Sequence, residues 1–82
     1  MTRDELRVIF VEELTGIAPE IEGSMIRDND NIQKTFDLDS MDIYNLLAAL
    51  HLRLNIDIPD SDAARLLTLN DALDYLFDTI TD

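Results

Sequence analysis

The sequence predicts an all-α fold, a four-helix bundle of three main helices and one short helix with a long first loop. Three stretches carry apolar residues at spacings of three and four, the period of an amphipathic helix. No stretch shows the apolar and polar alternation of a half-buried strand. The chain has 82 residues, enough for one domain with a thin core, so we expect a single unit over residues 1–82.

The first helix is expected from about Arg3 to Leu14. Thr2 and Glu5 have the spacing of a capping box, in which each side chain accepts a hydrogen bond from the other residue's backbone. Gly16 is typical of a helix end. Between these signals, one apolar stripe is formed by Leu6, Ile9, Phe10 and Leu14.

The following residues, 15–36, have no sustained period and contain Pro19 and Gly23, which are typical of loops. A connection longer than about 15 residues tends to be functional or to carry a short helix of its own. Its scattered apolar residues are expected to pin it across the helices. They are Ile17, Ile21, Met25, Ile26, Ile32 and Phe36.

The second main helix begins with either Asp39 or Ser40 as its N-cap, since both residue types are favoured there. It should end near Arg53, because the extended segment before Pro59 avoids helical dihedral angles. Its apolar stripe comprises Ile43, Leu46, Leu47, Leu50 and Leu54.

The rest of the chain predicts a short helical turn and a final helix. Asp60 and Ser61 can begin the turn, which runs to Leu66, and Thr68 with Asp71 suggests the next cap. The final amphipathic helix is indicated by Ala72, Leu73, Leu76 and Ile80.

The charge balance narrows the class of partner. Six Lys and Arg residues face 18 Asp and Glu residues, which gives a formal net charge of -12. Such a field repels nucleic acid and anionic membranes and attracts basic protein patches. The chain has no cysteine, no apolar signal core and no apolar run of about 20 residues, so we expect a cytoplasmic, monomeric protein without a membrane segment. The acidic loop from Asp28 lacks the glycine and glutamate of an EF-hand, so no metal site is expected.

Ser40 is the strongest candidate for a functional residue. A phosphate attached there would meet the unpaired N–H groups and the positive dipole of a helix N-terminus. A nucleophilic serine would need a nearby base, but the only histidine, His51, lies eleven residues along the same helix, about 16 Å away. The residues alone therefore leave two readings of Ser40, a modified residue and a plain helix cap.

Three motifs resemble the acyl carrier protein family. Asp39-Ser40-Met41 is similar to its Asp-Ser-Leu/Met attachment motif. Residues 57–60 resemble the segment that follows the second helix of that family, and residues 67–76 resemble its last loop and helix. The similarity is clear from about Phe36 onward. It implies a four-helix bundle in which Ser40 receives 4′-phosphopantetheine from coenzyme A through a phosphopantetheinyl transferase.

The same resemblance implies roles for the neighbours of Ser40. Asp39 would assist the transferase, around a divalent cation, and Met41 would contact partner enzymes. The protein would not be an enzyme. It would hold acyl groups as thioesters and present them to enzymes with basic patches, in fatty-acid, polyketide or related biosynthesis.

The second main helix departs from the family pattern. Glutamates are usual along it, but the matching positions here are Asn45, His51, Leu52 and Arg53. Asp42 remains on the helix, and Asp60 and Asp62 remain further along the chain. Because surface charge selects partners, this change predicts a specialised carrier rather than a housekeeping one. The expected partner-binding residues are Met41, Asp42, Tyr44, Ala48 and Asp60.

Met41, Tyr44 and Ala48 can share one helix face, which Leu52 extends, and this face is either an apolar docking strip or partly tucked into the bundle rim. Two other functions stay open. A peptidyl or aminoacyl carrier uses the same chemistry with different partners, and an unmodified acidic adaptor would use Ser40 only as a cap. The sequence does not reveal the cargo. The stripe of the second helix, with Leu73 and Leu76, can either line a cargo cavity or form the ordinary core.

Overall fold

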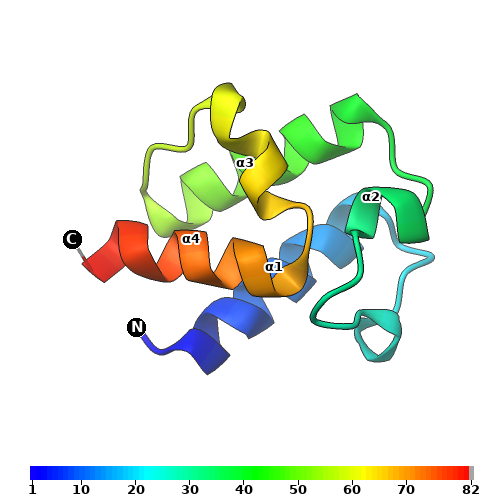
Figure 1. Ribbon diagram of the computed structural model, residues 1–82, viewed down its shortest axis with the longest axis horizontal. Coiled ribbons are helices and arrows are strands. Elements are labelled where there is room, and N and C mark those ends of the chain that lie inside the picture. The colour runs from blue at the N-terminus through cyan, green and yellow to red at the C-terminus, as the bar shows by residue number, and fades with distance from the viewer. Residues whose placement is uncertain (82) are drawn as a thin grey trace.

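Three long helices form the body of the protein, and shorter helices lie in the connections between them (Figure 1). The computed structural model describes residues 1–81, so Asp82, the last residue of the expected domain, lies outside the described residues. The long helices are α1 (Arg3–Ile17), α3 (Ser40–Leu54) and α4 (Leu69–Thr81). The short helix α2 (Ile32–Thr35) and the 3₁₀ helices η1 (Gly23–Met25) and η2 (Asp60–Leu66) complete the chain.

The predicted all-α class is confirmed, and the predicted short helix is η2. In the described part of the chain there is no strand, and one isolated antiparallel bridge joins Asn31 and Thr68. None of the described helices combines the length and the apolar character that crossing a bilayer requires. Helix α1 packs against α3 and α4, and η2 packs against the same two helices.

The predicted capping box of α1 is present, but the predicted end of this helix is wrong. The Thr2 hydroxyl accepts the Glu5 N–H at 3.1 Å, and Glu5 accepts the Thr2 N–H at 3.0 Å. The helix continues through Gly16 to Ile17 because a helical glycine costs only about 1 kcal/mol. It ends at Ala18, which takes non-helical dihedral angles because the residue before a proline, here Pro19, is disfavoured in the helical region.

The predicted apolar stripes form one core. Leu6, Phe10 and Leu14 of α1 are fully buried, and so is Leu50 of α3. Leu54 only packs against the edge of this core. The other buried residues of the long helices include Ile43, Leu46, Leu47, Leu69, Ala72, Leu73 and Leu76.

The long first connection is held by both apolar contacts and backbone hydrogen bonds. Ile21, Ile26 and Ile32 are buried as expected, whereas Met25 is 48% exposed and does not pin the loop. The Met25 sulfur instead turns back along its own short helix and accepts a weak hydrogen bond from the Glu22 N–H at 3.4 Å.

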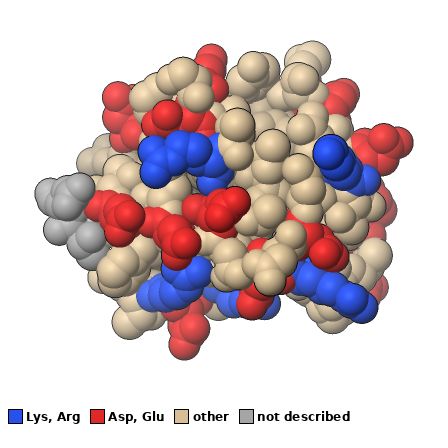
Figure 2. All heavy atoms as spheres, viewed as in Figure 1, with Lys and Arg blue, Asp and Glu red and all other residues tan. Residues whose placement is uncertain are grey.

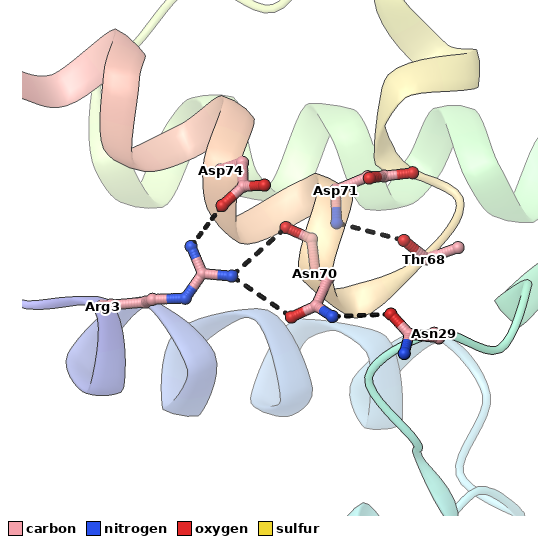
Figure 3. A network of polar contacts seen from close by, with 6 residues as sticks. All are labelled: Arg3, Asn29, Thr68, Asn70, Asp71 and Asp74. Atoms are coloured by element: carbon pink, nitrogen blue, oxygen red, sulfur yellow. Dashed lines mark hydrogen bonds and ion pairs between the residues drawn. The ribbon is translucent and has the colours of Figure 1, made fainter.

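A polar network joins this connection to the start of α4 and to α1 (Figure 3). Arg3 binds Asp74 at 2.5 Å and also donates to both the carbonyl and the side-chain oxygen of Asn70. The Asn70 amide donates to the Asn29 side chain at 2.7 Å. Thr68 accepts the Asp71 N–H at 3.0 Å, so the predicted Thr68–Asp71 cap is correct. The network fixes the N-terminal end of α4. Because η2 ends at Leu66, just before Thr68, the C-terminal end of η2 is held as well.

Candidate functional site

Asp39, and not Ser40, is the N-cap of α3. The Asp39 carboxylate accepts the Asp42 N–H at 2.9 Å, and the Asp42 carboxylate accepts the Asp39 N–H at 3.3 Å. Ser40 is the first helical residue and is exposed. Among residues 1–81, its hydroxyl has no hydrogen-bond partner. The plain-cap reading of Ser40 is therefore wrong, and the hydroxyl remains available.

The surroundings of Ser40 do not activate it as a nucleophile. His51 lies at the opposite end of α3, where its Nδ1 contacts the Ile56 carbonyl oxygen. An imidazole that is about three helical turns away cannot take the serine proton. Within the described residues, no group of three or more histidine or acidic side chains gathers to hold a metal ion.

The N-terminus of α3 can hold a phosphodiester on Ser40. The backbone N–H groups of Ser40 and Met41 lie in the first turn, where a helix has no internal acceptors for them. The capping carboxylates of Asp39 and Asp42 are close to the same point and oppose a second anion. The site thus offers two backbone N–H donors and the accessible Ser40 hydroxyl oxygen. The negative charge of Asp39 and Asp42 surrounds them, and a bound cation would neutralise it.

An open hollow of about 210 Å³ begins at Ser40. Its walls come from α2, α3, η2 and the residue after η2. In Figure 2 an uncharged area lies between the positions that η2 and α2 have in Figure 1, and charged side chains surround it. The residues that line the hollow are Gln33, Ser40, Ile43, Tyr44, Ala63, Ala64 and Leu67.

Sequence reasoning found only part of this hollow. The apolar stripe of α3 was one candidate lining for the cargo, and Ile43 is its residue that reaches the hollow. The other candidates belong to the core, among them Leu47 and Leu50 of α3 and Leu73 and Leu76 of α4. The lining residues that it missed come from other segments. They are Gln33, Ala63, Ala64 and Leu67, and no periodic signal in the sequence joins them.

The predicted apolar strip on α3 faces solvent. Met41 is 71% exposed, Tyr44 is 48% exposed and Leu52 is 79% exposed. Ala48 is also exposed, so none of the four is buried in the bundle. Tyr44 additionally reaches the rim of the hollow. The strip is therefore accessible along the whole of α3, from Ser40 to the end of the helix.

The remaining expected partner residues are Asp42, in the first turn of α3, and Asp60, in the first turn of η2. Asp42 is half-buried because it completes the cap, and Asp60 is exposed at the start of η2. Arg53, which replaces a usual acid, turns to α1 and lies 3.3 Å from both Glu12 and Glu13. The hydrogen bonds to these two carboxylates raise the pKa of Arg53, and the bond to Glu13 has the larger effect. Its charge is thus balanced within the protein.

Comparisons with known proteins agree over most of the chain. A family model described as the phosphopantetheine attachment site matches residues 4–76. The acyl carrier protein of Campylobacter jejuni strain RM1221 is 31% identical over 75 residues, which are 92% of this chain and 91% of that protein. The acyl carrier protein of Campylobacter hominis is 32% identical over 73 residues, 89% of this chain and 86% of that protein. The one from Wolinella succinogenes is 29% identical over 73 residues, covering 89% and 90%.

Proposed function

Because the chain belongs to the acyl carrier protein family, whose members carry phosphopantetheine, we propose that Ser40 is the residue to which the 4′-phosphopantetheine arm is attached. The observation that carries this proposal is the exposed Ser40 hydroxyl, which has no partner among residues 1–81 while Asp39 performs the capping. The first-turn N–H groups of α3 would donate to the phosphate oxygens. When bound, the arm supplies a terminal thiol that holds acyl groups as thioesters.

The residues beside Ser40 indicate that the transferase must supply a proton acceptor and a divalent cation. No histidine among the described residues lies next to the Ser40 oxygen, and the Asp39 and Asp42 carboxylates are held in the reciprocal cap, so the transferase must take the hydroxyl proton. Asp39 and Asp42 repel an incoming phosphate, and a divalent cation would turn this repulsion into attraction. We infer that Asp39 assists the transfer through such a cation, with Asp42 holding its carboxylate in place through the reciprocal cap.

Intact-mass measurement tests the attachment. The protein is incubated with coenzyme A, magnesium and a broad-specificity phosphopantetheinyl transferase. We expect a mass gain of one phosphopantetheinyl group, which Ser40→Ala abolishes. Ser24→Ala and Ser61→Ala are matched controls, because both replace exposed serines and should leave the gain intact. A wild-type protein that gains no mass with several transferases would instead be an unmodified acidic adaptor.

The exposed strip on α3 supports a specialised carrier with a dedicated partner. Met41, Tyr44 and Leu52 offer apolar contact area, and Leu52 does so at a position where the family usually has an acidic residue. Asp42 and Asp60 keep negative charge beside the attachment point, so the partner should carry cations near Ser40 and an apolar surface along α3. The acyl pathway, including the choice among fatty-acid, polyketide and peptidyl carriers, then depends on this partner.

Loading by partner enzymes tests the strip. Met41→Ala and Leu52→Ala should slow acyl transfer by the enzymes encoded beside this gene, because they remove apolar contact without changing charge. Val8→Ala is the matched control, since Val8 is 56% exposed on α1 and lies outside the strip. Equal rates with a housekeeping fatty-acid ketosynthase would contradict the specialised role.

A further inference from the structure

Gln33 gives the hollow beside Ser40 a polar wall. Its side chain is half-buried and lines the hollow together with mainly apolar residues such as Ile43, Ala63 and Leu67. The Gln33 carbonyl accepts the Leu38 N–H at 2.9 Å, but within residues 1–81 the side-chain amide has no hydrogen-bond partner. This amide offers two donors and one acceptor. The amide atoms remain accessible to solvent in the hollow, so a ligand there can exchange a hydrogen bond with them in place of water.

The backbone holds Gln33 in a defined position. Asn31 caps α2 by accepting the Lys34 N–H at 3.0 Å. Ile32 is fully buried, and its N–H donates to the Leu67 carbonyl at 2.7 Å. Leu67 itself lines the hollow, so this bond fixes one wall of the hollow against the other. The backbone of Gln33 is therefore fixed, which keeps its side chain beside the hollow.

The chemistry of the hollow matches the first part of the arm better than a hydrocarbon cargo. Next to its phosphate, the arm carries two methyl groups on one carbon, then a carbon with a hydroxyl group, and then an amide. An apolar wall accommodates the methyl groups, and the Gln33 amide can exchange a hydrogen bond with the arm's amide. A saturated acyl chain would cover Gln33 and leave it unpaired, which is unfavourable. Ser40 is itself part of the wall, so the attached end of the arm is the nearest occupant.

We propose that Gln33 binds the first amide of the arm and holds the unloaded arm over the hollow. This inference rests on the proposed attachment at Ser40. A single hydrogen bond between neutral groups is weak, so a partner enzyme can still draw the arm away. Gln33 is thus a positioning residue that sets the resting place of the arm.

Nuclear magnetic resonance of the holo protein tests this role, with intact mass verifying that every sample carries the arm. We expect contacts between the Gln33 side-chain NH₂ and the methyl groups of the unacylated arm. Gln33→Met keeps the side-chain length but removes the amide, and hydrogen exchange at the first amide of the arm should become about two- to tenfold faster. Lys34→Met is the matched control, because Lys34 is exposed on the same helix and should leave this exchange unchanged.

Two results would overturn the proposal. Contacts that arise only after acylation would make the hollow a cargo site, and an exchange rate that Gln33→Met leaves unchanged would place the arm in solvent. If intact mass shows that a sample has not gained the arm, neither measurement is made on it. That result would contradict the attachment at Ser40 and would not concern Gln33.

Discussion

The Tyr75 phenol donates a 2.6 Å hydrogen bond to the Asp62 carboxylate, and this bond joins α4 to η2. The ring of Tyr75 is buried, and the Arg65 guanidinium lies 4.7 Å from its centre. Both Asp62 and Arg65 belong to η2, which also supplies Ala63 and Ala64 to the hollow. Tyr75 therefore holds the outer wall of the hollow against the bundle, although it lies outside the hollow.

Replacing Tyr75 by phenylalanine should lower the free energy of unfolding by about 1–2 kcal/mol. The change removes one partly buried hydrogen bond to a charged group and leaves the ring in place. Urea denaturation measures the effect. Tyr44→Phe is the matched control, because Tyr44 is 48% exposed and should change stability little.

A double-mutant cycle with Asp62→Ala assigns the loss to this bond. The two changes should be strongly non-additive, since each removes the same interaction. Additive losses would mean that Tyr75 stabilises η2 through packing alone.

Stability should also fall at alkaline pH because of Tyr75. Burial, and then the hydrogen bond to Asp62, raises the pKa of Tyr75 from 10.0 to about 12. This total already includes the negative charges of Asp62 and Asp57, which raise the pKa, and the positive charge of Arg65, which lowers it. Because the folded state keeps the proton longer, this contribution is complete below the unfolded pKa and is lost as pH rises through the folded one.

Absorbance titration of the phenolate checks this shift. In a Tyr44→Phe background, Tyr75 is the only tyrosine, so the signal has a single source. Ionisation should occur near pH 12, and the free energy of unfolding should decline between 10.0 and about 12. Ionisation at the ordinary tyrosine pKa would be incompatible with the buried bond.

The features that could be predicted from the sequence depend on neighbouring residues. The Thr2–Glu5 box and the Thr68–Asp71 cap each lie within one helical turn, so their spacing alone reveals them. The buried stripe of α3 is readable for the same reason, since helical periodicity places its residues on one side. The attachment motif at residues 39–41 is also readable from the sequence, because the resemblance to the family lies in one short segment.

The features that could not be predicted depend on contacts between distant residues. Helix α2 has four residues, and the bond from its Ile32 N–H to Leu67 joins it to a segment 35 positions away. The hollow combines Gln33, Ile43 and Ala63 from three separate elements, so it has no local signature. The choice of Asp39 over Ser40 as cap was open because both side chains are suitable, and the reciprocal bond with Asp42 decides it.

Asp39 has a structural role and a proposed chemical role, and two substitutions separate them. Asp39→Asn keeps a good capping side chain, so stability should stay within about 0.5 kcal/mol, but the lost charge should slow modification of Ser40. Asp39→Ala removes the cap as well and should cost about 1 kcal/mol of stability. Urea denaturation and the rate of mass gain measure the two effects. A normal modification rate in Asp39→Asn would remove the proposed cation role.

The backbone just before the attachment site is strained at Asp37, and relieving it should stabilise the protein. Asp37 has a φ of 54°, in the left-handed region that costs residues with a Cβ atom about 1–2 kcal/mol. Glycine adopts this conformation without that cost, although it loses more entropy on folding. Asp37→Gly should therefore raise the free energy of unfolding by about 0.5–1 kcal/mol.

Two controls separate this backbone effect from the removal of a negative charge. Asp37→Asn removes the charge but keeps the Cβ atom, so any gain from reduced self-repulsion appears there alone. Asp57→Gly removes an exposed acid at a residue whose φ is not positive, and it should be neutral or destabilising. If Asp37→Asn stabilises the protein as much as Asp37→Gly does, the strain at Asp37 is negligible and the gain is electrostatic. If only the glycine variant gains stability, the gain comes from relief of the left-handed backbone at Asp37. The turn that leads into Ser40 keeps this conformation in the native protein because Leu38 is buried and donates its N–H to the Gln33 backbone carbonyl at 2.9 Å.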